Sequence, residues 1–170
     1  MTFHSDVTPP LAWLTKGAAI GLAGGLAEVL VVVAYSSVAG VGASEMAGAI
    51  ATAVGIDPGS AATGFVVHMA LSALLGIALL AAAKGSGLLR GGSALFTCAM
   101  GLLALGSVWI LNFFVVLPIL SPGFVHLLPY AVTLASKLMF ALAAVVTLRV
   151  LSASTGSPWV SPLWATRTTA

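Results

Sequence analysis

Two oppositely charged residues lie deep in long apolar runs and are the first candidates for chemistry. Glu28 lies eleven residues after Gly17, where the first run begins, and Lys137 lies thirteen residues before Val150, where the last run ends. At about 1.5 Å per helical residue, these depths are roughly 16 and 20 Å from the same membrane side. A charge near mid-membrane costs about 2.5–3.5 kcal/mol, so we expect the two residues to pair. The pair has two interpretations: an ion pair that fixes helix packing, or a proton or ion relay or polar substrate contact.

Four polar residues near the end of the chain follow helical spacing. His126, Tyr130, Thr133 and Lys137 stand at positions i, i+4, i+7 and i+11, which places them on one helical face. This pattern predicts a polar stripe from the outer surface to the membrane centre, facing a cavity or a partner helix. Pro129 is expected inside the first turns of the same helix, where it would weaken the backbone hydrogen bonds and expose a carbonyl.

A second group of polar residues belongs to the middle of the chain. His68 and Ser72 are four residues apart, and Gly64 and Gly76 flank them on the same helical face. Small residues let helices approach closely, so this face should pack against another helix. Asn112, in the third apolar run, falls in the same outer half of the membrane.

We therefore expect a common site below the outer surface, with Glu28 and Lys137 as its floor. Such a cavity could hold a water chain, a small polar ligand or a metal ion. The alternative is that each residue is a hydrogen-bonded packing residue. The expected members are His68, Asn112, His126 and Tyr130.

The elements that must position these residues follow from composition. The chain is 60% hydrophobic and 6% charged, whereas soluble domains carry about 25% charged residues. Apolar runs long enough to cross a bilayer occur four times, and in lipid such runs must be helices. The sequence predicts an all-α, four-transmembrane-helix bundle forming one domain over residues 1–150, followed by an irregular cytoplasmic tail over 151–170. The expected spans are 17–39, 61–83, 93–117 and 124–150.

The cations predict the orientation of the bundle. Five of the six Lys and Arg residues flank the spans, all on one side of the four-span arrangement: Lys16, Lys84, Arg90, Arg149 and Arg167. Both termini should therefore face the cytoplasm of a bacterial inner (plasma) membrane. A cleaved signal peptide is the competing interpretation of the first run. Its length and its central glutamate disfavour cleavage.

The connection between the first two spans, residues 41–60, has an amphipathic pattern. Ser44 can cap a helix that begins at Glu45, and apolar residues fall on one face of that helix. The members of that face are Met46, Ile50, Ala53 and Val54. We expect a short amphipathic helix on the outer membrane surface.

Three glycines at spacing four form a small-residue face on the first span. Gly17, Gly21 and Gly25 would let another backbone approach closely, within the bundle or in a homodimer. Glu28 lies on the edge of the same face, which favours packing within the bundle.

The second span opens with a Gly-x3-His-x3-Ser/Gly-x3-Gly pattern made of Gly64, His68, Ser72 and Gly76. In this pattern, and in the amphipathic segment after the first span, the chain resembles small uncharacterised four-helix bacterial inner-membrane proteins. The resemblance implies a fold and a location, and no established activity.

Several functional classes are disfavoured. The chain has no P-loop, GxSxG, HExxH or nucleotide fingerprint, and its total of four carboxylates argues against a hydrolase. Cys98 is the single cysteine, which rules out an internal disulfide and a cysteine metal cluster and is typical of a small apolar helix residue. Six cations are too few and too scattered for nucleic acid.

Three functional hypotheses remain, and an enzyme is not favoured. The first is a transport-type or accessory membrane protein with a polar path from His126 through Tyr130 and Thr133 to Lys137 and Glu28. The second is a structural or assembly subunit. The third is a b-type haem or quinone-linked subunit with His68 and His126 as axial ligands. No cofactor is predicted except in this third case, and a metal ion is left open. The expected partners are the lipid bilayer and either further copies of the chain or a membrane complex.

Overall fold

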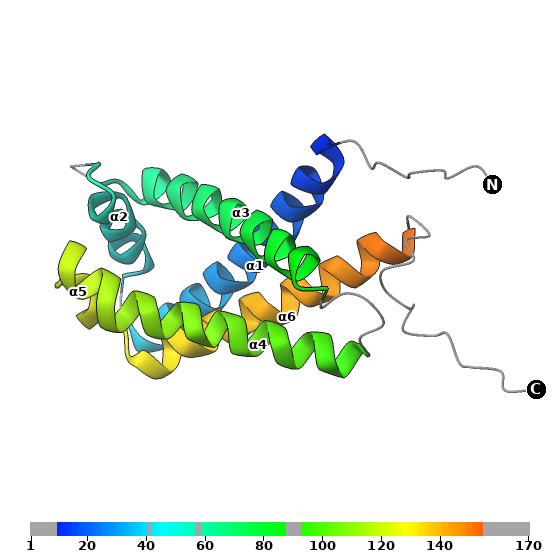
Figure 1. Ribbon diagram of the computed structural model, residues 1–170. Coiled ribbons are helices and arrows are strands. Elements are labelled where there is room, and N and C mark those ends of the chain that lie inside the picture. The colour runs from blue at the N-terminus through cyan, green and yellow to red at the C-terminus, as the bar shows by residue number, and fades with distance from the viewer. Residues whose placement is uncertain (1–9, 41, 57–58, 88–92, 155–170) are drawn as a thin grey trace, which may run out of the picture.

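The residues that the structure describes form a bundle of four long apolar helices with shorter helices in the connections (Figure 1). The structure is a computed structural model that describes residues 10–40, 42–56, 59–87 and 93–154. Its four helical stretches over Ala12–Ala39, Ala61–Gly85, Ala94–Leu120 and Tyr130–Ala153 are long and apolar enough to cross a membrane, which confirms the predicted fold class. In chain order the elements are α1 (Pro10–Ala39), α2 (Ala43–Ala53), α3 (Ala61–Gly85), α4 (Ala94–Leu111), the π-helical η1 (Asn112–Val116), α5 (Leu117–Leu120), the 3-10 turn η2 (Phe124–His126) and α6 (Tyr130–Ser154).

The long helices are arranged in the order α3, α1, α6, α4. Helix α1 lies between α3 and α6, while α4 packs on α6 and α2 packs on α3. Figure 1 shows α2 and α5 together at one end of the bundle, which we call the α2 end. At the other end, which we call the basic end, α1 begins, α3 ends, α4 begins and α6 ends. Lys16, Lys84 and Arg149 belong to the helix portions at this basic end.

Side-chain caps and glycines mark several helix ends. The hydroxyl of Ser60 accepts a hydrogen bond from the backbone N–H of Thr63 at 3.0 Å, and that of Ser93 accepts one from Phe96 at 3.2 Å. Serine is favoured at this position because its oxygen pairs an N–H that the first helical turn leaves open. Gly87 follows α3 with a φ of 69°, a conformation that suits glycine.

Glycines hold α1 and α3 in close contact, which confirms that the predicted small-residue face packs inside the bundle. A Cβ at Gly17 would collide with the backbone of Ile77, and one at Gly21 would collide with the backbone at Ser72. From the other side, a Cβ at Gly76 would meet the backbone of α1. The two backbones therefore touch without side chains between them, which is typical of small-residue faces in membranes.

The third span does not stop before Pro118 as expected. The helix passes through a π-helical segment, in which the N–H of Leu117 bonds to the carbonyl of Asn112, and continues to Leu120. A proline inside an α-helix clashes with the carbonyl four residues earlier and leaves it without a donor. One wider, π-helical turn just before the proline changes which carbonyl each N–H group bonds to, so the helix can continue past Pro118.

The fourth span begins later than expected. Residues 124–126 form a separate 3-10 turn, and α6 starts at Tyr130. Pro129 disfavours a helical conformation for the residue before it, so the helix starts after the proline rather than running through it. The carbonyl of Pro129 accepts hydrogen bonds from the N–H groups of Val132 at 2.9 Å and Thr133 at 3.2 Å. Pro129 therefore precedes α6 rather than lying inside its first turns as expected, so it does not interrupt the hydrogen bonds of the helix.

A short helix does occupy the first connection, as α2. Its N-cap residue is Gly42 rather than Ser44, and its buried residues are Met46, Gly48 and Ala51. The expected apolar face is only partly correct because α2 packs on α3: a Cβ at Gly64 would collide with the backbone of α2. The predictions that concern Arg90, Arg167 and residues 155–170 lie outside the described residues.

Candidate functional site

The centre of the candidate site is the carboxylate of Glu28. Its Oε1 lies 2.7 Å from the Nζ of Lys137, and only 6% of Glu28 is exposed. The predicted pairing of these two residues is confirmed. The ion pair joins α1 to α6 in the interior of the bundle.

A third titratable side chain shares the same carboxylate. The Nε2 of His68 lies 3.9 Å from Oε2 of Glu28 and 3.2 Å from the backbone carbonyl of Gly25. A carbonyl oxygen can only accept, so the hydrogen bond to Gly25 requires a proton on Nε2. Glu28, His68 and Lys137, from α1, α3 and α6, form what we call the charged triad.

The members of the charged triad lie at one level of the bundle. Glu28 is sixteen residues from Ala12, Lys137 sixteen from Ala153, and His68 seventeen from Gly85, all measured to the basic end. At 1.5 Å per residue these depths are about 24–26 Å. The triad therefore lies nearer the α2 end than the sequence-based depths of Glu28 and Lys137 indicated, because α1 and α6 extend further at the basic end.

Small residues beside Glu28 allow the three helices to meet. Gly24 lies against the ring of Phe140 on α6, and Gly25 lies against the side chain of Ser72 on α3. The ring of Phe140 is fully buried, and the Nζ of Lys137 lies 5.4 Å from its centroid. This contact adds a cation–π attraction to the ion pair. The glycine positions thus bring Lys137 and His68 within reach of one carboxylate.

Ser72 serves packing in this structure. It is 4% exposed, and its side chain lies against the backbone of α1 at Gly25, one turn from Glu28. The predicted neighbourhood of Ser72 and His68 is therefore present, with the serine forming part of the wall between α1 and α3.

Thr133 connects α6 to α4 on the α2 side of the triad. Its hydroxyl accepts a hydrogen bond from the indole N–H of Trp109 at 3.0 Å and donates to the carbonyl of Tyr130 at 3.0 Å. The ring of Tyr130 is stacked with Phe114 and meets Trp109 edge to face. Tyr130, Thr133 and Lys137 share α6 as expected, but Thr133 is held by an aromatic cluster that the polar spacing did not indicate.

His126 and Asn112 stand apart from the charged triad. His126 is exposed and belongs to η2, so it does not continue the face of α6. Asn112 is half-buried and begins the π-helical segment. The polar contacts of the His68 ring within the described residues are with Gly25 and Glu28, which makes His68 a member of the charged triad.

A second buried cation, Arg149, lies at the basic end, and the sequence pattern did not predict its structural role. Arg149 is 7% exposed, and its Nη2 donates to the hydroxyl of Thr97 at 2.9 Å, which joins α6 to α4. From the sequence, Arg149 served only to predict orientation. The available signal was that Thr97 and Arg149 lie at similar depths on consecutive, antiparallel spans.

No family model, curated protein or solved structure matches the chain. Over the ranges that the structure describes, no three His, Cys, Asp or Glu side chains lie together as a metal site would require. The functional inference therefore depends on the charged triad itself.

Proposed function

We propose that this integral membrane protein is of the transport or accessory type and that the charged triad exchanges a proton during its work. One observation carries the proposal: a single buried carboxylate contacts an ammonium group at 2.7 Å and lies 3.9 Å from an imidazole, with each group on a different helix. Ionisable groups inside a membrane commonly mark ion or proton pathways.

The histidine is what separates this proposal from a simple packing pair. Lys137 already balances the charge of Glu28, so packing alone needs no third titratable group. An imidazole can carry a proton at physiological pH and deliver it to a nearby carboxylate. In that step the doubly protonated imidazolium of His68 loses its Nε2 proton: the Nε2–H bond and the hydrogen bond to the Gly25 carbonyl break, an O–H bond forms on Oε2 of Glu28, and the imidazole becomes neutral.

Protonation of Glu28 would also change how the helices hold together. A neutral carboxylic acid no longer balances the charge of Lys137, and an uncompensated cation in a low-dielectric interior is unfavourable. Gain of a proton would therefore weaken the contact between α1 and α6, and loss of the proton would restore it. This coupling of proton binding to helix packing is what a transport-type protein requires.

The face of α6 offers a route toward the triad from the α2 end. Tyr130 is 43% exposed at the start of α6, and Lys137 lies seven residues later, about 10 Å along the axis. Thr133 lies between them. In this proposal, Asn112 and His126 form the entrance to this route at the α2 end.

Proton movement in reconstituted vesicles tests the proposal. Proteoliposomes containing a trapped pH dye receive a potassium diffusion potential, and the rate of internal pH change is recorded. We expect wild-type vesicles to change pH faster than protein-free vesicles, and His68→Gln to lose at least about nine-tenths of that difference. Ser107→Ala, an exposed serine on α4, is the control and should behave like wild type. Wild-type vesicles that match protein-free vesicles would contradict the proposal.

A structural or assembly subunit is the second candidate, and the contacts around the triad support it. Lys137, Thr133 and Ser136 all bind groups of the protein itself: Lys137 contacts Glu28, Thr133 contacts Trp109, and Ser136 donates to a backbone carbonyl. In this case the wild-type protein would move no protons, and the effect of His68→Gln would be limited to a lower stability. The b-type haem hypothesis is tested separately by the visible spectrum of the purified protein: a Soret band would support it, and a colourless protein would exclude it.

A further inference from the structure

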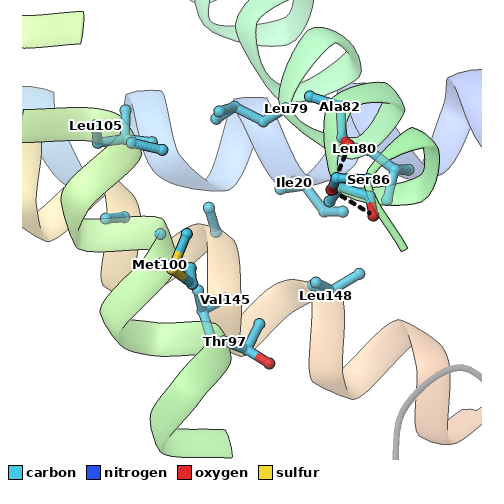
Figure 2. A pocket seen from close by; sticks show the side chains of 15 residues that line it. Ile20, Leu79, Leu80, Ala82, Ser86, Thr97, Met100, Leu105, Val145 and Leu148 are labelled. Carbon is cyan, nitrogen blue, oxygen red and sulfur yellow. Dashed lines mark hydrogen bonds between the residues drawn. The ribbon is translucent and has the colours of Figure 1, made fainter. Parts of the chain in front are cut away.

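An apolar groove separates α3 from α4, and it is distinct from the charged triad. Its volume is about 340 Å³, and α1 and α6 form its floor (Figure 2). Figure 2 shows Leu79 and Leu80 of α3 on one side and Met100 and Leu105 of α4 on the other. We call this the α3–α4 groove. It exists because α3 packs on α1 while α4 packs on α6, so the first and last helices of the row leave a space between them.

The groove presents an apolar surface despite its two hydroxyl residues. The hydroxyl of Ser86 donates to the carbonyl of Ala82 at 2.8 Å, and that of Thr97 donates to the carbonyl of Ser93 at 3.1 Å and accepts from Arg149. Both hydroxyls are therefore satisfied within the protein. The other lining residues are apolar or glycine, so the occupant that fits is a hydrocarbon chain.

The groove occupies the half of the bundle toward the basic end. Along α4 it extends from Thr97 to Leu105, and along α6 from Ala141 to Leu148. At 1.5 Å per residue these stretches are about 12 and 10 Å long. One leaflet of a bilayer contributes about 15 Å of hydrocarbon. The length and position of the groove thus match one acyl chain from the leaflet at the basic end.

The charges at the groove mouth favour an anionic headgroup. Lys84 is exposed and stands in sequence between the lining residues Ala83 and Ser86, and its Nζ lies 5.7 Å from the ring centroid of Trp13. Arg149 holds the lining residue Thr97 at the same end. The acidic residues that the structure describes, Glu28 and Glu45, lie in the half toward the α2 end. Among the residues that the structure describes, the exposed Lys84 therefore supplies positive charge at the mouth, and juxtamembrane cations attract anionic lipid.

We propose that the α3–α4 groove is a binding site for one anionic phospholipid, with an acyl chain between α3 and α4 and the headgroup phosphate beside Lys84. The contacts are of two independent kinds, apolar for the chain and electrostatic for the headgroup. The proposal does not depend on the charged triad, which lies further toward the α2 end of the bundle than the groove.

Lipid retention measured by native mass spectrometry tests this proposal. The full-length protein is purified in detergent, incubated with equal amounts of phosphatidylglycerol and phosphatidylcholine, and washed before measurement. We expect wild type to retain one phosphatidylglycerol per chain, in at least about tenfold preference to phosphatidylcholine. Lys84→Gln should retain a lipid but lose most of the preference.

Filling the groove should remove the bound lipid. Ala104→Trp and Met100→Trp each place an indole among the lining residues, and we expect either to abolish retention. Ala99→Trp adds the same side chain to an exposed position of α4 outside the groove and should retain the lipid as wild type does. Circular dichroism identifies any variant that does not fold, and the second groove variant then carries the test.

Three outcomes would overturn the proposal. Equal lipid retention by wild type and a folded groove variant would show that lipid binds elsewhere. Equal retention of the two phospholipids by wild type would exclude an anionic site. A wild-type dimer that the groove variants dissociate would assign the groove to a second copy of the chain.

Discussion

Glu28 and Lys137 each cost free energy when placed in lipid, and their contact makes both positions tolerable. The carboxylate is 8% exposed at its side chain and the ammonium-bearing side chain 14%. Burial of this extent removes most of the water that would otherwise stabilise either charge. Breaking such a pair leaves one uncompensated charge, which is more unfavourable than removing both.

At this scale we predict strong coupling between Glu28 and Lys137. Glu28→Gln and Lys137→Met should each lower the free energy of unfolding by about 3–5 kcal/mol, because each leaves the other residue as an uncompensated buried charge. The double variant should lose less than the sum of the single losses. Thermal and denaturant unfolding of the four proteins in detergent measures the coupling. Additive losses would mean that the two side chains do not interact in solution.

Depth counting predicted this pair but did not assign His68 to it. His68 lies seven residues from the outer end of its expected span, 61–83, so the depth count placed it with Asn112 and His126 in the outer half of the membrane. The structure extends α1 and α6 at the basic end, which moves Glu28 and Lys137 to the level of His68. A shift of a few residues at a helix end is a shift of several ångströms in depth, and hydropathy does not determine helix ends that closely.

At the scale of the elements, α1 is the helix on which the others assemble. Its glycines contact α3 through Gly17 and Gly21 and accept the ring of Phe140 from α6 at Gly24. In lipid the helices gain little from apolar burial, so close packing of this kind contributes much of their association.

We predict that a branched side chain at Gly76 separates α3 from α1. The added Cβ would meet the backbone of α1, which cannot move aside as a flexible side chain can. Gly76→Val should therefore lower the free energy of unfolding by about 1–3 kcal/mol or more. Ala78→Val, at an exposed position on the same helix, should change stability by less than about 0.5 kcal/mol. The comparison is made by thermal unfolding in detergent. Equal effects of the two variants would argue against backbone contact at Gly76.

The two prolines show why element ends were harder to predict than element existence. Pro118 was expected to end a helix and Pro129 to lie inside one. Instead the chain passes Pro118 through a wider turn and begins α6 directly after Pro129. Proline removes one donor and restricts the preceding residue, but neighbouring turns decide whether the helix adapts or starts anew.

On the scale of the whole molecule, the bilayer explains why the fold class was predictable. Backbone groups in lipid must be paired within the chain, so four long apolar runs can only be helices. The order of the helices was not predictable in the same way, because hydropathy carries no information about neighbours. The α3–α4 groove follows from that order and had no counterpart in the sequence pattern.

The orientation of the molecule is the remaining prediction, and it decides which leaflet meets the groove. Lys16, Lys84 and Arg149 belong to the basic end, and positive charge is retained on the cytoplasmic side. We therefore expect both termini inside, with Gly40 on the outer side and Gly87 on the inner side. Fusions of a paired reporter after Gly40, after Gly87 and at the C-terminus measure this: alkaline phosphatase is active outside, and a fluorescent protein folds inside. Phosphatase activity at the C-terminus would mean that the bundle has the opposite orientation and that the groove lies in the outer leaflet. The two conclusions go together because the basic end carries both the groove and the ends of α1 and α6 that lead to the termini.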